Sequence, residues 1–91
     1  MDVGVKNNND LNRFEVDLGD QIAVMEYMRA GNNIIFTHTE VPQAYEGQGI
    51  ANQMAAVALA YAKSEGLKVQ PLCPFVKGYI EKHPEYKEIS W

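Results

Sequence analysis

Three side chains in this sequence could take part in proton or acyl transfer: His38, Glu40 and Cys73. An imidazole or a carboxylate can move a proton near neutral pH, and a thiol can act as a nucleophile. Each also has a purely structural explanation. Glu40 can be a solvated carboxylate at the rim of a sheet, His38 a hydrogen-bonded sheet residue, and Cys73 a small buried side chain. The residue types alone leave both explanations open.

A glycine-containing segment, Glu46-Gly47-Gln48-Gly49-Ile50-Ala51, precedes Asn52 at the start of a predicted helix. The N-terminus of a helix presents unpaired N–H groups and a partial positive charge, and glycines let the backbone approach an anion closely. A turn followed by a helix start explains the same residues without a ligand. The segment lacks the lysine of a P-loop. Asn52 stands where a dinucleotide fingerprint needs its third glycine, which disfavours that reading.

The elements that position these residues begin with a predicted antiparallel meander. Alternating polar and apolar residues predict a strand over 13–18, and β-forming residues predict two more over 21–29 and 33–39, with turns at Gly19-Asp20 and Gly31-Asn32. A period of two along the third strand predicts that four side chains share one face: Ile34, Phe36, His38 and Glu40. The first twelve residues, which are polar and rich in asparagine, are expected to be loosely held.

Helical spacing of apolar residues predicts one long helix over 49–65, with Gly66 after its end. A strand over 67–73 follows, and a strand-helix-strand connection implies that it lies parallel to the third strand. A second helix is expected over 74–82, with Pro74 in its first turn. Cys73 then lies close to a helix N-terminus, which favours the thiolate form. The thiol could accept an acyl group or only line a pocket.

Composition excludes several classes of function. The 91 residues suit one domain, and 46% of them are hydrophobic. A net charge of -4 disfavours nucleic acid as a partner. One cysteine and two histidines make a structural zinc site improbable, and we expect no metal. Without a signal-peptide pattern or a membrane-length apolar run, the expected location is the cytoplasm. Exposed sheet edges are compatible with a monomer or a weak homodimer.

Several motifs in order resemble the acetyl-CoA core of the GNAT superfamily of N-acetyltransferases, in its short stand-alone branch. These are Phe36-Thr37-His38-Thr39-Glu40-Val41-Pro42, the glycine segment, Cys73-Pro74-Phe75-Val76, Tyr79-Ile80 and His83-Pro84-Glu85-Tyr86. The resemblance implies an α+β fold of the three-layer α/β type, with an antiparallel meander followed by a β-α-β-α core. It also implies that residues 1–91 form a single minimal domain.

The resemblance also implies ligands and roles. Acetyl-CoA is the expected donor, and a small amine or a protein lysine the expected acceptor. The implied coenzyme-binding residues are Glu40, Val41, Glu46, Gly47, Gln48, Gly49, Ile50, Ala51, Asn52, Cys73, Pro74 and Phe75, with the backbone of Glu40 and Val41 pairing with the pantetheine arm. Glu40 is placed like a general base and Tyr79 like the general acid for the coenzyme thiolate. Glu46 replaces the usual Gln or Arg, and the helices that usually cover the acceptor side are absent.

Two other functions stay open. The chain could be a module that binds CoA or acyl-CoA without efficient catalysis, which the small size and Glu46 favour. It could also be an interaction domain that binds no coenzyme.

Overall fold

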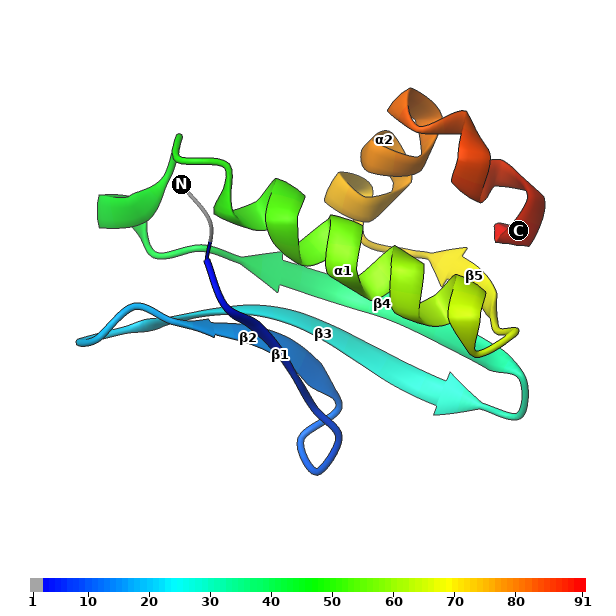
Figure 1. Cartoon of the computed structure of the whole chain (residues 1–91), viewed down its shortest axis with the longest axis horizontal. Helices are drawn as coiled ribbons and strands as arrows, with labels where there is room; N and C mark the ends of the chain where they lie inside the picture. Colours follow the sequence, from blue (N-terminus) through cyan, green and yellow to red (C-terminus); the bar gives the residue numbers. More distant parts are fainter. Residues whose placement is uncertain (1–2) are drawn as a thin grey trace.

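The computed structural model describes residues 3–91, which form a five-stranded sheet and two α-helices (Figure 1). The strands are β1 (Val5–Asn8), β2 (Arg13–Asp17), β3 (Ile22–Ala30), β4 (Asn33–Glu40) and β5 (Lys68–Pro71), and they lie in the sheet in chain order. The helices are α1 (Ile50–Ser64) and α2 (Pro74–Lys82), with short 3-10 segments η1 (Gln43–Tyr45) and η2 (Pro84–Ile89). Strands β1 to β4 pair antiparallel and β5 pairs parallel to β4, so the predicted meander and parallel last strand are confirmed.

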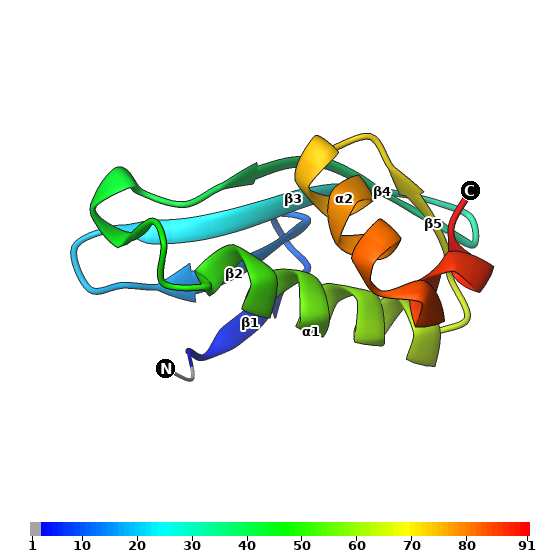
Figure 2. The ribbon, with the colours of Figure 1, turned by 90° about the horizontal axis from the view of Figure 1, so that it is seen from above.

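Both helices pack against the same face of the sheet (Figures 1 and 2). The inward side chains of β2, β3 and β4 form one core with buried residues of α1 and α2: Phe14, Val16, Met25, Tyr27, Ile34, Phe36, Ile50, Met54, Leu59, Val76 and Ile80. The α+β class is confirmed. Of the three layers of this fold type, residues 3–91 supply two, because no helix among them covers the other face, on which Ile22 and Met28 are exposed.

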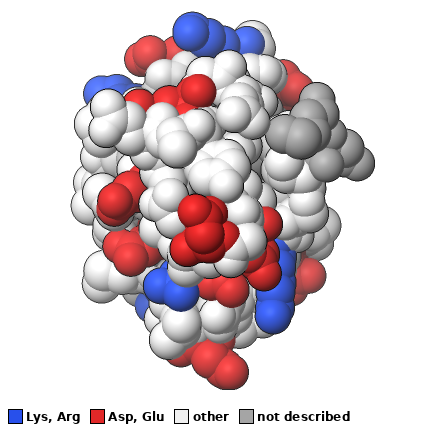
Figure 3. All heavy atoms as spheres, turned by 90° about the vertical axis from the view of Figure 1, so that its left-hand side faces the viewer, with Lys and Arg blue, Asp and Glu red and all other residues white. Residues whose placement is uncertain are grey.

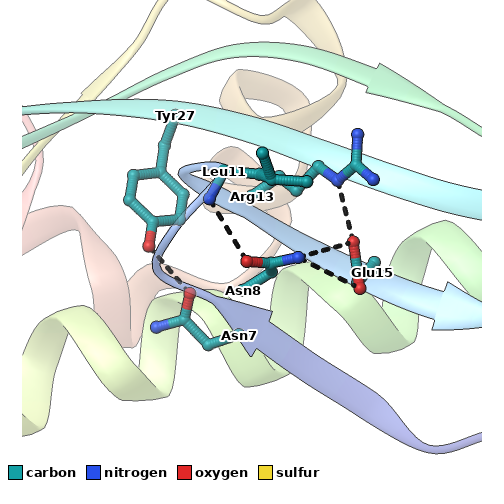
Figure 4. A network of polar contacts seen from close by, with 6 residues as sticks. All are labelled: Asn7, Asn8, Leu11, Arg13, Glu15 and Tyr27. Atoms are coloured by element: carbon teal, nitrogen blue, oxygen red, sulfur yellow. Dashed lines mark hydrogen bonds and ion pairs between the residues drawn. The ribbon is translucent and has the colours of Figure 1, made fainter.

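The N-terminal segment forms a strand, so the expectation of a loosely held segment is wrong for residues 5–8, while Met1 and Asp2 lie outside the described residues. Strand β1 pairs with β2 along its whole length. The Tyr27 hydroxyl donates to Asn7 Oδ1 at 2.7 Å (Figure 4). Val5 packs against the core. Tertiary contacts thus override the low strand propensity of the asparagines.

Strand β4 contains a β-bulge at Thr37. Before it, Phe36 pairs with Tyr27; after it, His38 pairs with Glu26, so Thr37 has no partner residue on β3. Because paired residues share a face, the extra residue moves every later side chain of β4 to the face opposite to that predicted. Thr39, opposite Met25, therefore lies on the helix side, while His38 and Glu40 lie on the helix-free face.

Candidate functional site

A cavity of about 330 Å³ opens between the end of β4 and the N-terminus of α1. Its lining residues come from β4 and the loop after it, from the glycine segment and from the start of α2: Thr39, Val41, Tyr45, Glu46, Gly47, Gly49, Ile50, Ala51, Asn52 and Phe75. Of the predicted coenzyme residues, Glu40, Gln48, Pro74 and Cys73 do not line it. Of the three predicted contact segments, the cavity therefore joins Val41 of residues 40–41, all of residues 46–52 except Gln48, and Phe75 of residues 73–75.

The glycine segment supplies the conformation that an anion site needs. Gly47 and Gly49 have φ angles of 82° and 79°, in the left-handed region that favours glycine, and Gly49 is the N-cap of α1. The first hydrogen bond of the helical pattern runs from the Gln53 N–H to the Gly49 carbonyl oxygen, at 3.0 Å. The preceding N–H groups, which belong to residues that line the cavity, are those that a helix leaves for a ligand.

Tyr45, which directly precedes the glycine segment, is hydrogen-bonded to the turn between β2 and β3. Its hydroxyl lies 3.2 Å from the Leu18 carbonyl oxygen and 3.1 Å from Asp20 Oδ1. The hydrogen bond to Asp20 and the charge of its carboxylate raise the pKa of Tyr45. The Tyr45 side chain thus forms one wall of the cavity and fixes it to the β2–β3 turn.

The sheet forks at the inner end of the cavity. Pairing of β4 with β5 ends at Phe36 and Pro71, and the Cys73 N–H donates to the Phe36 carbonyl at 2.9 Å. Beyond that point the thiol of Cys73 lies 3.2 Å from Thr39 Oγ1, and either group can be the donor. Cys73 is only 4% exposed and is not a lining residue, whereas Thr39 lines the cavity. Thr39 therefore lines the cavity, and its hydroxyl contacts the buried thiol.

His38 and Glu40 form a pair on the helix-free face, with Nε2 and Oε1 3.2 Å apart. Their side chains are 53% and 70% exposed. The expectation that they share a face with Phe36 is wrong, because the bulge at Thr37 reverses the alternation. They consequently lie across β4 from the cavity, at the same fork of the sheet.

Tyr79 lies in a second cavity of about 530 Å³, which shares Asn52 and Phe75 with the first and is otherwise lined by Pro74, Gly78, Tyr79, Lys82 and His83. The Tyr79 and His83 rings stack at 3.8 Å, and His83 Nδ1 lies 2.8 Å from the Tyr79 carbonyl oxygen. Because a carbonyl only accepts, Nδ1 carries the hydrogen. Burial raises the pKa of Tyr79. Tyr79 is therefore a lining residue of the second cavity and not of the first, which Thr39 lines.

Sequence reasoning missed Thr39, Lys82 and His83. A regular alternation along the strand predicted that Thr39 lies on the opposite face. The bulge at Thr37 could not be predicted, because no residue type in the strand indicates an inserted residue. Lys82 and His83 stand three and four positions after Tyr79 at the end of α2. This spacing predicts that they lie near Tyr79, but it does not predict a cavity beside them.

Comparison with known proteins gives the class to which this fold belongs. The family model described as GCN5-related N-acetyl-transferase matches residues 13–89, and the chain belongs to this family, as its motifs indicated.

Among individual proteins, the chain is 40% identical over 63 residues to the Protein NATD1 of Homo sapiens and to that of Gallus gallus, covering 68% of this chain. It is 35% identical over 69 residues to that of Danio rerio. The matched region spans 56%, 57% and 63% of these relatives. A GCN5-like protein from Staphylococcus aureus, solved by NMR, has a TM-score of 0.75 and 25% identity, covering 98% of this chain and 88% of that one.

Two further properties concern residues 3–91. None of their helices is long and apolar enough to cross a membrane. They also contain no group of three or more His, Cys, Asp or Glu residues arranged to hold a metal ion.

Proposed function

We propose that this domain binds acetyl-CoA and transfers the acetyl group to an amine. One observation carries the proposal: a single cavity joins the unpaired N–H groups at the start of α1 to the end of β4, where β5 no longer pairs with it. An anion and an extended polar chain would occupy these two parts. The pyrophosphate and the pantetheine arm of CoA have this chemistry and this order.

The second cavity extends the binding site. It begins at Asn52 and Phe75, which both cavities share, and leads to the stacked rings of Tyr79 and His83 beside Lys82. In the proposed complex the adenosine lies here, with its base against the ring pair and its 3′-phosphate beside Lys82. None of the described residues that line the first cavity has a cationic side chain, so phosphate binding there depends on backbone N–H groups.

The acceptor approaches from the helix-free face. A neutral amine attacks the thioester carbon at the fork, forming a C–N bond; the C–S bond then breaks, the nitrogen loses a proton and the sulfur gains one. Glu40, paired with His38, takes the nitrogen's proton. Acidic side chains extend across the end of the molecule that carries the glycine segment, with Lys and Arg mainly toward its edges (Figure 3). The exposed carboxylate of Glu40 on the helix-free face supports a cationic acceptor such as a polyamine or a lysine side chain.

The alternative chemical route passes through an acetyl-Cys73 intermediate. The thiol would attack the thioester, release CoA and pass the acetyl group to the amine. Intact mass measured after incubation with acetyl-CoA, without an acceptor, tests this route, and Cys73→Ala is its control. An acetyl adduct that wild type forms and the variant lacks supports it, whereas an unmodified wild-type chain argues for direct transfer.

The function itself is tested by titration calorimetry and turnover. We expect CoA and acetyl-CoA to bind, and dephospho-CoA to bind more weakly through loss of the Lys82 contact. Release of the CoA thiol in the presence of spermidine or a lysine peptide measures transfer. Binding without transfer to any amine would identify a CoA-binding module, and absence of binding at millimolar CoA would overturn the coenzyme proposal.

A further inference from the structure

The inference concerns the proton that the departing coenzyme thiolate needs, and it rests on the proposed function. The Thr39 hydroxyl and the Cys73 thiol, on the helix side of the fork, carry transferable protons and lie 3.2 Å apart. The Tyr45 hydroxyl, in the same cavity wall, is already bonded to the Leu18 carbonyl and the Asp20 carboxylate. Thr39 lies in the wall of the cavity, and Cys73 lies behind it with 4% of its surface exposed. Of these two residues only Thr39 lines the cavity, so a ligand sulfur there would reach Thr39 before Cys73.

We propose that Cys73 and Thr39 form a proton relay that protonates the sulfur of the departing coenzyme. The Cys73 S–H donates to Thr39 Oγ1, and the Thr39 O–H donates toward the cavity. A hydroxyl can accept one hydrogen bond while donating another, which is what a relay requires of its middle member. The arrangement assigns the thiol an acid role, in place of a nucleophilic one.

The proton balance is complete. When the tetrahedral intermediate collapses, the C–S bond breaks and its electron pair stays on the coenzyme sulfur. That sulfur takes the Thr39 proton while Thr39 takes the Cys73 proton, which leaves Cys73 as a thiolate. The amide nitrogen gives its extra proton to Glu40, and exchange with solvent returns a proton to Cys73. Donor and final acceptor are both thiols, so the transfer runs between groups of the same chemical kind.

The position of Tyr79 agrees with this assignment. Its ring lines the second cavity and stacks on His83, and burial raises the pKa of its hydroxyl, which weakens it as an acid. Phe75 stands between the two cavities as a shared wall. We therefore expect Tyr79→Phe, which removes only the hydroxyl and keeps the ring, to leave kcat within about 2-fold of wild type, and Tyr79→Ala, which removes the ring, to weaken coenzyme binding.

The decisive variants are Thr39→Val, which removes the hydroxyl at nearly constant volume, and Thr39→Ser, which keeps it. For Thr39→Val we expect kcat to fall about 100-fold, the usual size of a general-acid contribution, with the Kd for CoA from calorimetry within about 2-fold of wild type. Thr39→Ser restores most of the rate. Ser64→Ala is the control, because it deletes a hydroxyl away from the fork, in the last turn of α1, where Ser64 Oγ donates to the Tyr61 carbonyl at 3.0 Å.

A double variant separates a relay from simple packing. If Thr39 and Cys73 act as a unit, Thr39→Val with Cys73→Ala is no slower than the slower single variant, since the second substitution removes nothing further. Losses that multiply would overturn the relay, as would a Thr39→Val rate equal to wild type or an acetyl adduct on Cys73. If wild type itself binds CoA but shows no turnover, the proposed activity and the relay both fail, whereas wild-type turnover with an unaffected Thr39→Val rejects the relay alone.

Discussion

His38 lies directly opposite Glu26 across β4 and β3, and its Nε2 lies 3.2 Å from Glu40 Oε1. Without the bulge at Thr37, His38 would pair with Met25 and point into the core. The inserted residue therefore does two things at once. It brings Thr39 to the helix side of the sheet, where the cavity lies, and turns the imidazole and the carboxylate to the side from which we expect the acceptor to approach.

Glu40→Gln tests the acceptor side. Because the amide cannot accept the amine's proton, we expect kcat to fall about 100-fold while the Kd for CoA stays within about 2-fold. Turnover assays and calorimetry on the same preparation measure the two effects. Glu65→Gln, at the far end of α1, is the control. Equal losses of affinity and rate would show that Glu40 acts in coenzyme binding and not as the base.

Gly49→Ala tests the backbone site against a matched glycine elsewhere. Gly49 and Gly31 both have positive φ angles, of 79° and 59°, and a Cβ added to either meets no atom within 4 Å. Each substitution should cost about 1–2 kcal/mol of stability through backbone strain. Only Gly49→Ala should weaken CoA binding, by about 10-fold or more, because its Cβ stands at the phosphate approach. Equal CoA affinities in calorimetry, with matched denaturant midpoints, would remove the glycine segment from the site.

Glu46→Gln tests the electrostatics of the same segment. Glu46 lines the cavity, and its carboxylate repels a pyrophosphate bound at the start of α1. Removing this charge should tighten CoA binding by about 3-fold, since an exposed charge pair is worth up to about 1 kcal/mol. The gain should shrink at high salt as screening increases. Calorimetry at two ionic strengths measures it, and a salt-independent gain would point to packing instead of charge.

Glu15 gives a prediction for stability against pH. The hydrogen bond from Arg13 Nε at 2.8 Å holds the pKa of Glu15 below its ordinary value of 4.5, helped by Asn8 (Figure 4). A lowered folded pKa contributes stability above the unfolded value, and this stability is lost as the pH falls through the folded value. Glu15→Gln should thus lose less stability than wild type between about pH 5 and pH 3. Urea unfolding at several pH values measures this difference, and parallel curves would contradict it.

The sequence predicted the later elements closely and the first one poorly. The long helix expected over 49–65 is found at Ile50–Ser64, and the second at Pro74–Lys82 as expected. These elements have strong periodicity and clear end signals in Gly66 and Pro74. Strand β1 lacks such a signal, because its pairing and the contact between Asn7 and Tyr27 arise only in the tertiary structure.

The candidate site also has one part that the sequence predicts and another that it does not. Residues 46–52 could be predicted because glycines before a helix have a local physical meaning, and most of them line the cavity. The contact between Thr39 and Cys73 joins residues 34 positions apart and depends on the bulge, so no local pattern indicates it. Face assignments on a strand are only as good as the assumption that no residue is inserted.

The fork between β4 and β5 has a consequence for folding as well as for chemistry. An extended ligand that pairs with the free edge of β4 would act as a temporary sixth strand, bound only by the folded chain. By mass action such a ligand raises the unfolding free energy, by about 2.7 kcal/mol at a concentration one hundred times its Kd. If acetyl-CoA is that ligand, as proposed, the domain's lifetime in a cell would depend on the local concentration of acetyl-CoA, and a fall in that concentration would lower the amount of folded protein.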